Sequence, residues 1–334
     1  MPTNRTVTVY GASGHTGRFV VAELLARGWT PVLAGRSADR LQAVAADHPG
    51  LAVRPADVGS PAELDGALAG AAAVVNCAGP FATTAAPVIE AALRARIPYL
   101  DVAAEIEANI DTFADFGDRA RAVGVVVVPA MAFYGGLGDL LATAAMGDWP
   151  AADEIGIAYG LSSWAPTEGT LAAGRVSRER RGGRRVVYTD GRLQYRTDDA
   201  PTGEWDFPPP LGRRPVVGEF TMADSVTIPR HLVTPEIRSS MTLVAVQDLS
   251  DAVLRPPGRD ASQAFVVDVV VRRGDAERRA AVEGRDIYAV SAPLVVEATE
   301  RVLGGQVDRT GVLAAGEAFD AGSFLAALPL TRVR

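Results

Sequence analysis

Three glycines close to the amino terminus have a spacing that suits the binding of a phosphate group. Gly11, Gly14 and Gly17 recur at every third position, after the apolar run TVTVY and before a stretch with helical periodicity. Glycine permits a tight turn, and the first turn of a helix offers free N–H groups to a pyrophosphate. A turn without a ligand would not need three glycines. The spacing therefore predicts a dinucleotide site, with contacts from Gly11, Ser13, Gly14, His15, Thr16 and Gly17.

The end of the second predicted strand distinguishes NAD from NADP. An NAD site typically has an acidic residue there, which binds the ribose hydroxyls. This chain has Arg36 and Ser37 instead. Arginine can form charge-assisted hydrogen bonds with a 2′-phosphate, although Arg36 could also be a surface residue that ends the strand. We therefore expect NADP as the cofactor.

Two further turns complete the predicted cofactor site. Asp57 and Val58 follow the third predicted strand and could border the adenine, although Asp57 could equally begin a helix. Cys77, Ala78 and Gly79 follow the fourth strand, where small residues would let the nicotinamide half pass. The alternative for these three residues is a tight turn without a ligand.

Carboxyl and hydroxyl groups after the later strands are candidates for the chemical step. Asp101 and Glu105 follow the fifth predicted strand and Tyr134 follows the sixth. Ligands of open parallel sheets bind beyond the carboxyl ends of the strands, so all three residues are expected to face the nicotinamide. Either carboxyl could bind a substrate amine or act as an acid, but carboxylates also cap helices. Tyr134 could donate a proton or a hydrogen bond to a substrate carbonyl, or wedge between two domains.

Two residues in the second half are weaker candidates. His231 is the only histidine outside the first half of the chain, and a lone histidine is more often structural than catalytic. Tyr288 precedes a predicted helix and either lines the site or packs in the core. No group of His, Cys and Asp has the spacing of metal ligands, so we expect no metal.

Composition excludes several classes of protein. Hydrophobic residues make up 48% of the 334 residues and charged residues 22%, as in folded proteins. All 33 basic residues counted as Lys or Arg are arginine, so lysine chemistry, including the Tyr-x-x-x-Lys pair of short-chain dehydrogenases, is impossible. The net charge of −7 argues against nucleic acid as a partner. The absence of a long apolar run argues against a membrane span, and the single cysteine and the lack of a signal-peptide core in residues 1–8 favour the cytoplasm.

The elements that must position these residues alternate regularly in the first part of the chain. This alternation predicts an α/β fold, a doubly wound Rossmann sheet over residues 1–131. Residues 132–290 have fewer regular helices and predict a second α+β domain, for substrate binding or dimerisation, on a mixed or antiparallel sheet. Strands are predicted at 6–10, 31–34, 51–54, 72–76, 98–101, 124–128, 154–161, 236–246, 264–272 and 279–283, and helices at 15–27, 37–47, 61–69, 85–96, 106–122 and 291–303.

Several segments in this order resemble the saccharopine-dehydrogenase-like oxidoreductases, which include bacterial trans-acting enoyl reductases. In the first half they are VYGASGHTGR, LAGRSADRL, VVNCAGPF, PVIEAALRARIPYLDVAAE and GVVVVPAMAFYGGLGDLL, and in the second half EGTLAAGRVS, VTIPRHLVTPEIRS and GRDIYAVSAPLVVEATERVL. The resemblance implies a Rossmann domain, use of NAD(P), and a carboxyl-terminal segment 291–334 that returns to the first domain. The second domain is shorter than in saccharopine dehydrogenases, so saccharopine is not expected as the substrate.

The expected activity is hydride transfer from NADPH to a C=C, C=N or C=O bond of a small or carrier-bound metabolite, in a protein that could form a homodimer. The alternative is a redox sensor that binds NADP without turnover. The polar segment 174–215 is expected to form a hairpin and a long loop. Its arginines either form a solvated surface or attract an acidic partner, and they are Arg178, Arg180, Arg181, Arg184 and Arg185.

Overall fold

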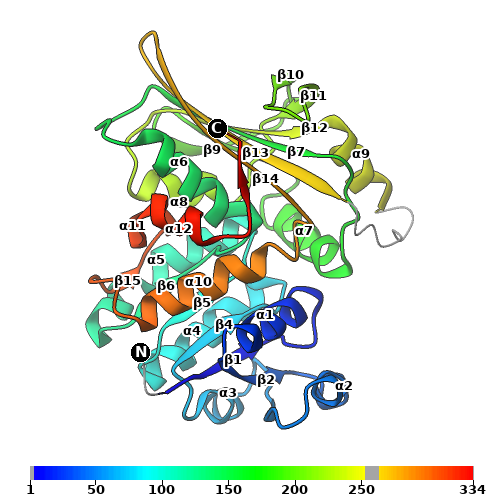
Figure 1. Cartoon of the computed structure of the whole chain (residues 1–334), viewed down its shortest axis with the longest axis vertical. Coiled ribbons are helices and arrows are strands. Elements are labelled where there is room, and N and C mark those ends of the chain that lie inside the picture. Colours follow the sequence, from blue (N-terminus) through cyan, green and yellow to red (C-terminus); the bar gives the residue numbers. More distant parts are fainter. Residues whose placement is uncertain (1–3, 253–262, 334) are drawn as a thin grey trace.

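The protein is described by a computed structural model over residues 4–252 and 263–333. Figure 1 shows two sheets, one in the lower part of the molecule and one in the upper part, with a long helix between them. The amino terminus lies at the lower sheet, and the chain ends beside the upper one.

The lower sheet has the predicted doubly wound topology. Its strands are β1 (Thr6–Tyr10), β2 (Thr30–Gly35), β3 (Val53–Pro55), β4 (Ala73–Asn76), β5 (Tyr99–Asp101), β6 (Val126–Val128) and β15 (Gly311–Val312). They run in the order β15-β6-β5-β4-β1-β2-β3, and each neighbouring pair is parallel. The predicted Rossmann fold is therefore confirmed, with a last strand supplied by the end of the chain.

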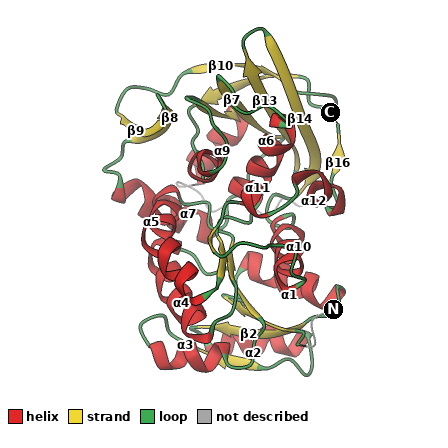
Figure 2. Ribbon diagram, turned by 90° about the vertical axis from the view of Figure 1, so that its left-hand side faces the viewer, coloured by secondary structure: helices red, strands yellow, loops and turns green. Residues whose placement is uncertain are grey.

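Helices cover both faces of this sheet, as Figure 2 shows with α4 and α5 on one side and α1 and α10 on the other. Val20 and Leu24 of the first helix share a core with Leu294, whereas Ile89 and Phe116 belong to the core on the opposite face. The helices of the lower sheet are α1 (His15–Ala26), α2 (Ala38–Asp47), α3 (Pro61–Leu68), α4 (Phe81–Ala95), α5 (Ile106–Val123) and α10 (Ser291–Leu303).

The upper sheet is mixed, as predicted. Its strands are β7 (Glu154–Leu161), β8 (Arg185–Thr189), β9 (Arg192–Arg196), β10 (Thr202–Asp206), β11 (Arg213–Gly218), β12 (Ile237–Thr242), β13 (Ala264–Arg273), β14 (Ala276–Arg285) and β16 (Thr331–Arg332). The main path is β10-β11-β12-β7-β13-β14-β16. Strands β12 and β7 are parallel, and the other neighbours on this path are antiparallel.

Two predictions about the second half are wrong. The strand predicted at 236–246 ends at Thr242, because Ala245, Val246 and Leu249 have helical spacing and pack their apolar side against the core. The segment 174–215 contains the end of a helix and parts of two hairpins instead of one hairpin and a loop. The helices here are α6 (Gly138–Met146), α7 (Glu168–Arg180), α8 (Asp224–Thr227), α9 (Leu243–Ala252), α11 (Ala315–Ala318) and α12 (Ala321–Ala327).

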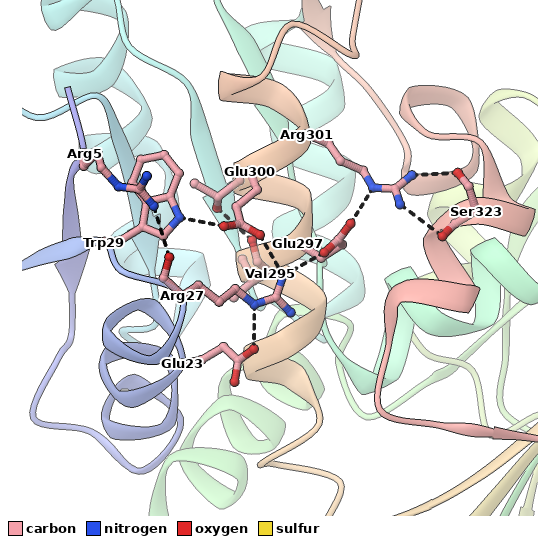
Figure 3. A network of polar contacts seen from close by, with 10 residues as sticks. Arg5, Glu23, Arg27, Trp29, Val295, Glu297, Glu300, Arg301 and Ser323 are labelled. Carbon is pink, nitrogen blue, oxygen red and sulfur yellow. Dashed lines mark hydrogen bonds and ion pairs between the residues drawn. The ribbon is translucent and has the colours of Figure 1, made fainter. Parts of the chain in front are cut away.

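A polar network, which Figure 3 shows, connects helix α10 with the end of α1. The Arg27 guanidinium, at the end of α1, binds carboxylates of Glu297 and Glu300 at 2.7 Å each, and also Glu23. The indole of Trp29 donates a hydrogen bond to Glu300. Helix α10 is therefore fixed against α1 by charged groups as well as by its apolar face.

The chain end returns to both sheets. Strand β15 extends the lower sheet, but β16 pairs with β14 in the upper sheet and α12 packs on α6. The expectation that segment 291–334 returns to the first domain therefore describes only part of it. Helix α10 begins at Ser291, as predicted; Val290 precedes it, and the Ser291 hydroxyl donates to the carbonyl of Ile287.

Candidate functional site

Two of the three glycines in the first turn are required by the protein itself. Gly11 has φ +85°, and a Cβ atom there would lie 2.7 Å from the backbone nitrogen of Ala78. A Cβ atom on Gly17 would overlap the carbonyl oxygen of Gly11. Gly11 therefore lets the turns after β1 and β4 touch, and Gly17 lets α1 pack closely against the turn.

Gly14 is different, because its backbone is unstrained and a Cβ there would be crowded by a single atom. Its φ is −72°, a value that any residue adopts, and it is exposed. The nearest atom to a Cβ there is the carbonyl oxygen of Gly11 at 3.2 Å. Gly14 is the residue before α1, and no side chain caps this helix. The turn thus presents uncapped helical N–H groups beside a position left without a side chain, which is the arrangement that binds a pyrophosphate.

Three other residues predicted for the cofactor site, Ser13, His15 and Thr16, belong to the same turn. Ser13 and Thr16 are half-buried. The His15 ring makes edge-to-face contacts with Phe19 and with Tyr288, with 5.2 Å between ring centroids in each case. His15 therefore connects the turn with a residue from the far end of the second half.

Arg36 extends from the carboxyl end of β2. Its side chain is exposed, and no hydrogen bond or ion pair within the described ranges involves it. Ser37 caps α2, because its hydroxyl accepts a hydrogen bond from the Arg40 N–H at 3.4 Å. The charge of Arg36 is thus available at the edge of the sheet where a ribose would lie.

The turns after β3 and β4 have the predicted positions. Asp57 is exposed, and its carboxylate accepts a hydrogen bond from the Gly59 N–H at 2.8 Å, which is a local turn. Val58 is half-buried beside it, and Gly79 is exposed after β4. The backbone N–H of Cys77 donates to the carbonyl of Tyr10 in β1 at 2.7 Å. Burial raises the pKa of the Cys77 thiol, so this cysteine is held as a neutral group beside the first turn.

The two candidate acids have backbone partners. Asp101 is fully buried and accepts hydrogen bonds from the N–H groups of Ala103 and Ala130 and from the Tyr99 hydroxyl. The Glu105 carboxylate accepts from the N–H groups at Phe81 and Ala82 and thereby caps α4 from a distance.

These partners explain two features of the site. The cap supplied by Glu105 accounts for the start of α4 at Phe81, four residues before the predicted start. Burial raises the pKa of both Asp101 and Glu105, and the backbone N–H groups counteract it. Both carboxyls therefore hold the loops after β4, β5 and β6 in place.

Tyr134 has a buried hydroxyl without a hydrogen-bond partner in the described part of the chain. Its ring lies against Tyr159, with 4.9 Å between centroids, and against Trp164 at 5.7 Å. The neighbouring Gly135 has φ +107°, and a Cβ there would lie 2.8 Å from that of Ala130. Burial raises the pKa of Tyr134 well above its usual value, and Tyr288 and Asp224 raise it further. The hydroxyl is therefore protonated at neutral pH and free to donate a hydrogen bond.

Tyr288 lies between the glycine turn and the second half of the protein. Its hydroxyl accepts hydrogen bonds from the Trp164 indole at 3.1 Å and from the Thr167 N–H at 3.2 Å. It also bonds the Thr170 hydroxyl at 2.9 Å. The Tyr288 hydroxyl is therefore engaged by residues 164–170 of the second half, while its ring contacts the glycine turn, so simple core packing does not describe it.

Sequence reasoning missed a group of buried acids near Tyr134. Asp224 is fully buried and binds the Tyr159 hydroxyl, and burial raises its pKa to about 6. Asp139 is also fully buried and binds His231 at 2.7 Å. Burial opposes a charged imidazole, but Asp139 raises the pKa of His231 above its usual value. The glycines of GGLGD, which precede Asp139, are the available sequence signal. Gly138 is close to this group, because a Cβ on it would crowd Tyr159 and Asp224.

Most of the arginine-rich segment has intramolecular partners. Arg180 pairs with Asp111 at 2.7 Å and Arg181 with Glu107 at 3.4 Å, both on α5. Arg185 pairs with Asp198 and Glu219, and Arg184 lies over the Tyr195 ring. Four of the five arginines therefore have a carboxylate or an aromatic ring of the same chain as a partner.

Two searches of residues 4–252 and 263–333 gave negative results. No group of three or more His, Cys, Asp or Glu residues there could hold a metal ion. No helix in these ranges is long and apolar enough to cross a membrane.

Comparison with known proteins agrees with this geometry. Residues 11–122 match a family model described as NAD(P)H-binding. The chain is 33% identical over 152 residues to a probable mitochondrial saccharopine dehydrogenase-like oxidoreductase of Arabidopsis thaliana, covering 40% of this chain and 34% of the relative. It is 29% identical over 145 residues to the saccharopine dehydrogenase-like oxidoreductase of Rattus norvegicus, covering 38% and 34%. The chain thus matches about a third of the length of these relatives.

The fold extends the similarity to the second half. Saccharopine dehydrogenase (L-Glu forming) from Saccharomyces cerevisiae aligns with 99% of this chain and 100% of its own, with a TM-score of 0.66 and 13% identity. At this identity the match concerns the fold alone. The resemblance seen in the sequence is confirmed: part of the chain is similar to saccharopine dehydrogenase-like oxidoreductases, residues 11–122 match an NAD(P)H-binding domain, and the chain has the saccharopine dehydrogenase fold.

Proposed function

We propose that this protein is an NADP-dependent oxidoreductase that transfers a hydride to a C=C, C=N or C=O bond of a small or carrier-bound metabolite. The observation that carries the proposal is the glycine turn: Gly11 and Gly17 serve the fold, whereas Gly14 leaves room beside uncapped helical N–H groups. A ligand that approaches the backbone of this turn would account for the missing side chain at Gly14.

The preference for NADP is supported by Arg36. Its guanidinium is exposed at the end of β2, and Ser37 begins α2 beside it. Arginine binds phosphate through two parallel N–H groups, so a 2′-phosphate would compensate the charge at this edge.

The protein's own residues would orient the substrate and exclude water. When bound, a reduced nicotinamide supplies the hydride. Tyr134 would donate a hydrogen bond to the oxygen or nitrogen of the bond being reduced, because its hydroxyl is protonated and has no other partner in the described part of the chain. Asp101 and Glu105 act as positioning residues, since backbone N–H groups engage their carboxylates.

A redox sensor is the second candidate. The observation in its favour is that Tyr134 is 7% exposed and that both candidate acids are engaged by the backbone. A sensor would bind NADPH and NADP⁺ with different conformations and would not oxidise NADPH in the presence of any substrate.

The test combines binding with turnover. We expect calorimetry to detect NADPH binding and expect the absorbance of reduced nicotinamide to fall with some member of a panel of enones, imines, ketones and thioesters. Tyr134→Phe should lower kcat and leave NADPH affinity unchanged. Absence of NADPH binding would refute the proposal, and binding without turnover of the panel would favour the sensor.

The proposal extends to assembly and location. We propose a cytoplasmic homodimer on the basis of the single cysteine and the second domain. A carrier-bound substrate stays within the proposal, but we give the arginine segment no docking role, since four of its five charges have partners in the chain.

A further inference from the structure

Tyr288 makes contact with both the glycine turn and the segment that lies against Tyr134. We propose that Tyr288 is a positioning residue that couples dinucleotide binding at the glycine turn to the ordering of residues 164–181, here called the strap. The inference rests on the proposed function, because it assumes that a dinucleotide binds the turn.

The first contact of Tyr288 is with the turn. Its ring meets the edge of the His15 ring at 5.2 Å, and His15 is the first residue of α1. A pyrophosphate bound at the start of α1 would restrict the backbone of His15, and therefore also the ring that touches Tyr288. Dinucleotide binding can therefore affect Tyr288 simply by restricting the motion of the His15 ring that it contacts.

The second contact is with the start of the strap. The Tyr288 hydroxyl binds the Trp164 indole, the Thr167 N–H and the Thr170 hydroxyl. Thr167 is the capping residue of α7, and its own hydroxyl accepts from the Thr170 N–H at 3.1 Å. One hydroxyl of the β14–α10 connection therefore fixes both the Trp164 ring and the first turn of α7.

The strap is attached to the rest of the protein mainly through polar contacts. Ser177 is the only buried residue of α7. It binds Glu107 of α5, and Arg180 and Arg181 form ion pairs with the same helix. Figure 2 shows α7 beside α5, between the two sheets. A helix such as α7, with so little buried apolar surface, has a low free energy of local opening, so a few hydrogen bonds at its start can decide its order.

The consequence concerns the substrate side of the site. Trp164 is 5% exposed and lies against Tyr134, the residue proposed to bind the substrate. When Tyr288 holds Trp164, the surroundings of the Tyr134 hydroxyl are defined. Cofactor binding would therefore prepare the substrate site, and by thermodynamic reciprocity an ordered strap would favour cofactor binding.

Hydrogen exchange of the full-length protein with and without NADPH tests the coupling. In the wild type, NADPH should slow exchange both in residues 11–18 and in the strap. In Tyr288→Phe, residues 11–18 should still respond, but the response of the strap should fall about two- to tenfold, the range that corresponds to one ordinary hydrogen bond. Tyr195→Phe is the matched control, because Tyr195 is 47% exposed and lies outside this set of contacts, and it should behave as the wild type.

Thr170→Val removes a partner of Tyr288 from the strap side and keeps the test valid if Tyr288→Phe fails to fold. We expect it to reduce the response of the strap in the same direction. An unchanged strap response in either folded variant would overturn the inference, as would a wild-type strap that ignores NADPH while residues 11–18 respond. If NADPH protects neither segment and calorimetry detects no binding, the proposed function fails, and the inference fails with it.

Discussion

At the scale of single residues, the glycine turn offers a matched pair of substitutions. Gly17→Ala would force a methyl group onto the carbonyl of Gly11, and such overpacking costs about 1–3 kcal/mol or more of unfolding free energy. Gly14→Ala meets only one atom at 3.2 Å and should cost less than about 1 kcal/mol. Urea denaturation should therefore show Gly17→Ala as the less stable variant. NADPH calorimetry should show that Gly14→Ala, although folded, binds NADPH at least about tenfold more weakly than the wild type. Normal NADPH affinity in Gly14→Ala would contradict the ligand-based explanation of this glycine.

Arg36 is the residue expected to choose the cofactor. Arg36→Ala should weaken NADPH binding by about 1–3 kcal/mol, the contribution of a charge-assisted hydrogen bond, and leave NADH binding nearly unchanged. Isothermal calorimetry with both cofactors measures this difference. Arg40→Ala is a suitable control, because Arg40 is also exposed and lies one turn into α2. An equal loss for NADPH and NADH would sink the assignment of Arg36 to the 2′-phosphate.

Asp224 should make stability depend on pH. Burial raises its pKa in the folded protein from 3.8 to about 6, so the folded state binds the proton more tightly than the unfolded state. The stabilisation is complete below about pH 4 and is lost as the pH rises through 6, a loss of about 2–3 kcal/mol. Asp224→Asn cannot titrate and does not lose this stabilisation. The difference in unfolding free energy, variant minus wild type, should therefore increase by about 2–3 kcal/mol between pH 4 and pH 7. Asp47→Asn, at an exposed site, is the control, and parallel curves for Asp224→Asn and wild type would refute the prediction.

At the scale of elements, the contact between α1 and α10 depends on Arg27. Arg27→Met would leave the carboxylates of Glu23, Glu297 and Glu300 without their shared cation, and it should lower the unfolding free energy by about 1–3 kcal/mol. Arg94→Met is the comparison, since the Arg94–Asp65 pair is about half exposed and should contribute less than about 1 kcal/mol. Thermal denaturation at low salt measures both. Equal effects would mean that the network of Figure 3 contributes no more than a surface ion pair.

The elements also show where sequence reasoning succeeds. The first six strands of the lower sheet and α10 were predicted within a few residues, because their apolar spacing is local information, whereas the strand β15 was not predicted. The start of α4 was not, because its cap is Glu105, a residue from beyond the next strand. The same limit applies to Asp101, whose partners Ala103 and Ala130 belong to two different loops. Residues 243–246 were predicted as strand although they begin a helix, because a short apolar run suits a strand or a helix equally well.

The candidate site shows the same division. The glycine turn and Arg36 could be predicted, since contiguous residues define them. The contacts of Tyr288 with Thr167, Thr170 and His15 could not, because they join residues more than a hundred positions apart in the sequence. The buried Asp224 and Asp139 follow no pattern of spacing, and their importance depends on burial, which a single sequence does not reveal.

At the scale of the whole molecule, the two halves should not be separable at residue 290. A protein truncated there would lose α10, β15 and β16, and would expose the core face of α1 that Leu294 and Val295 cover. We expect it to be unfolded or aggregated, as judged by circular dichroism and gel filtration. The full chain treated in parallel is the control. A soluble truncated protein that still binds NADPH would refute the prediction.

The pairing of β15 with β6 has a consequence for synthesis on the ribosome. Gly311 and Val312 complete the edge of a sheet whose other strands were made before residue 129. During synthesis, β6 therefore lacks its partner strand, and the apolar face of α1 is not covered by α10, until the second half of the chain has been translated. Contacts this far apart in the chain slow folding, and an unpaired strand edge invites association with other chains. Efficient production of this protein should therefore depend on holding chaperones that act throughout translation.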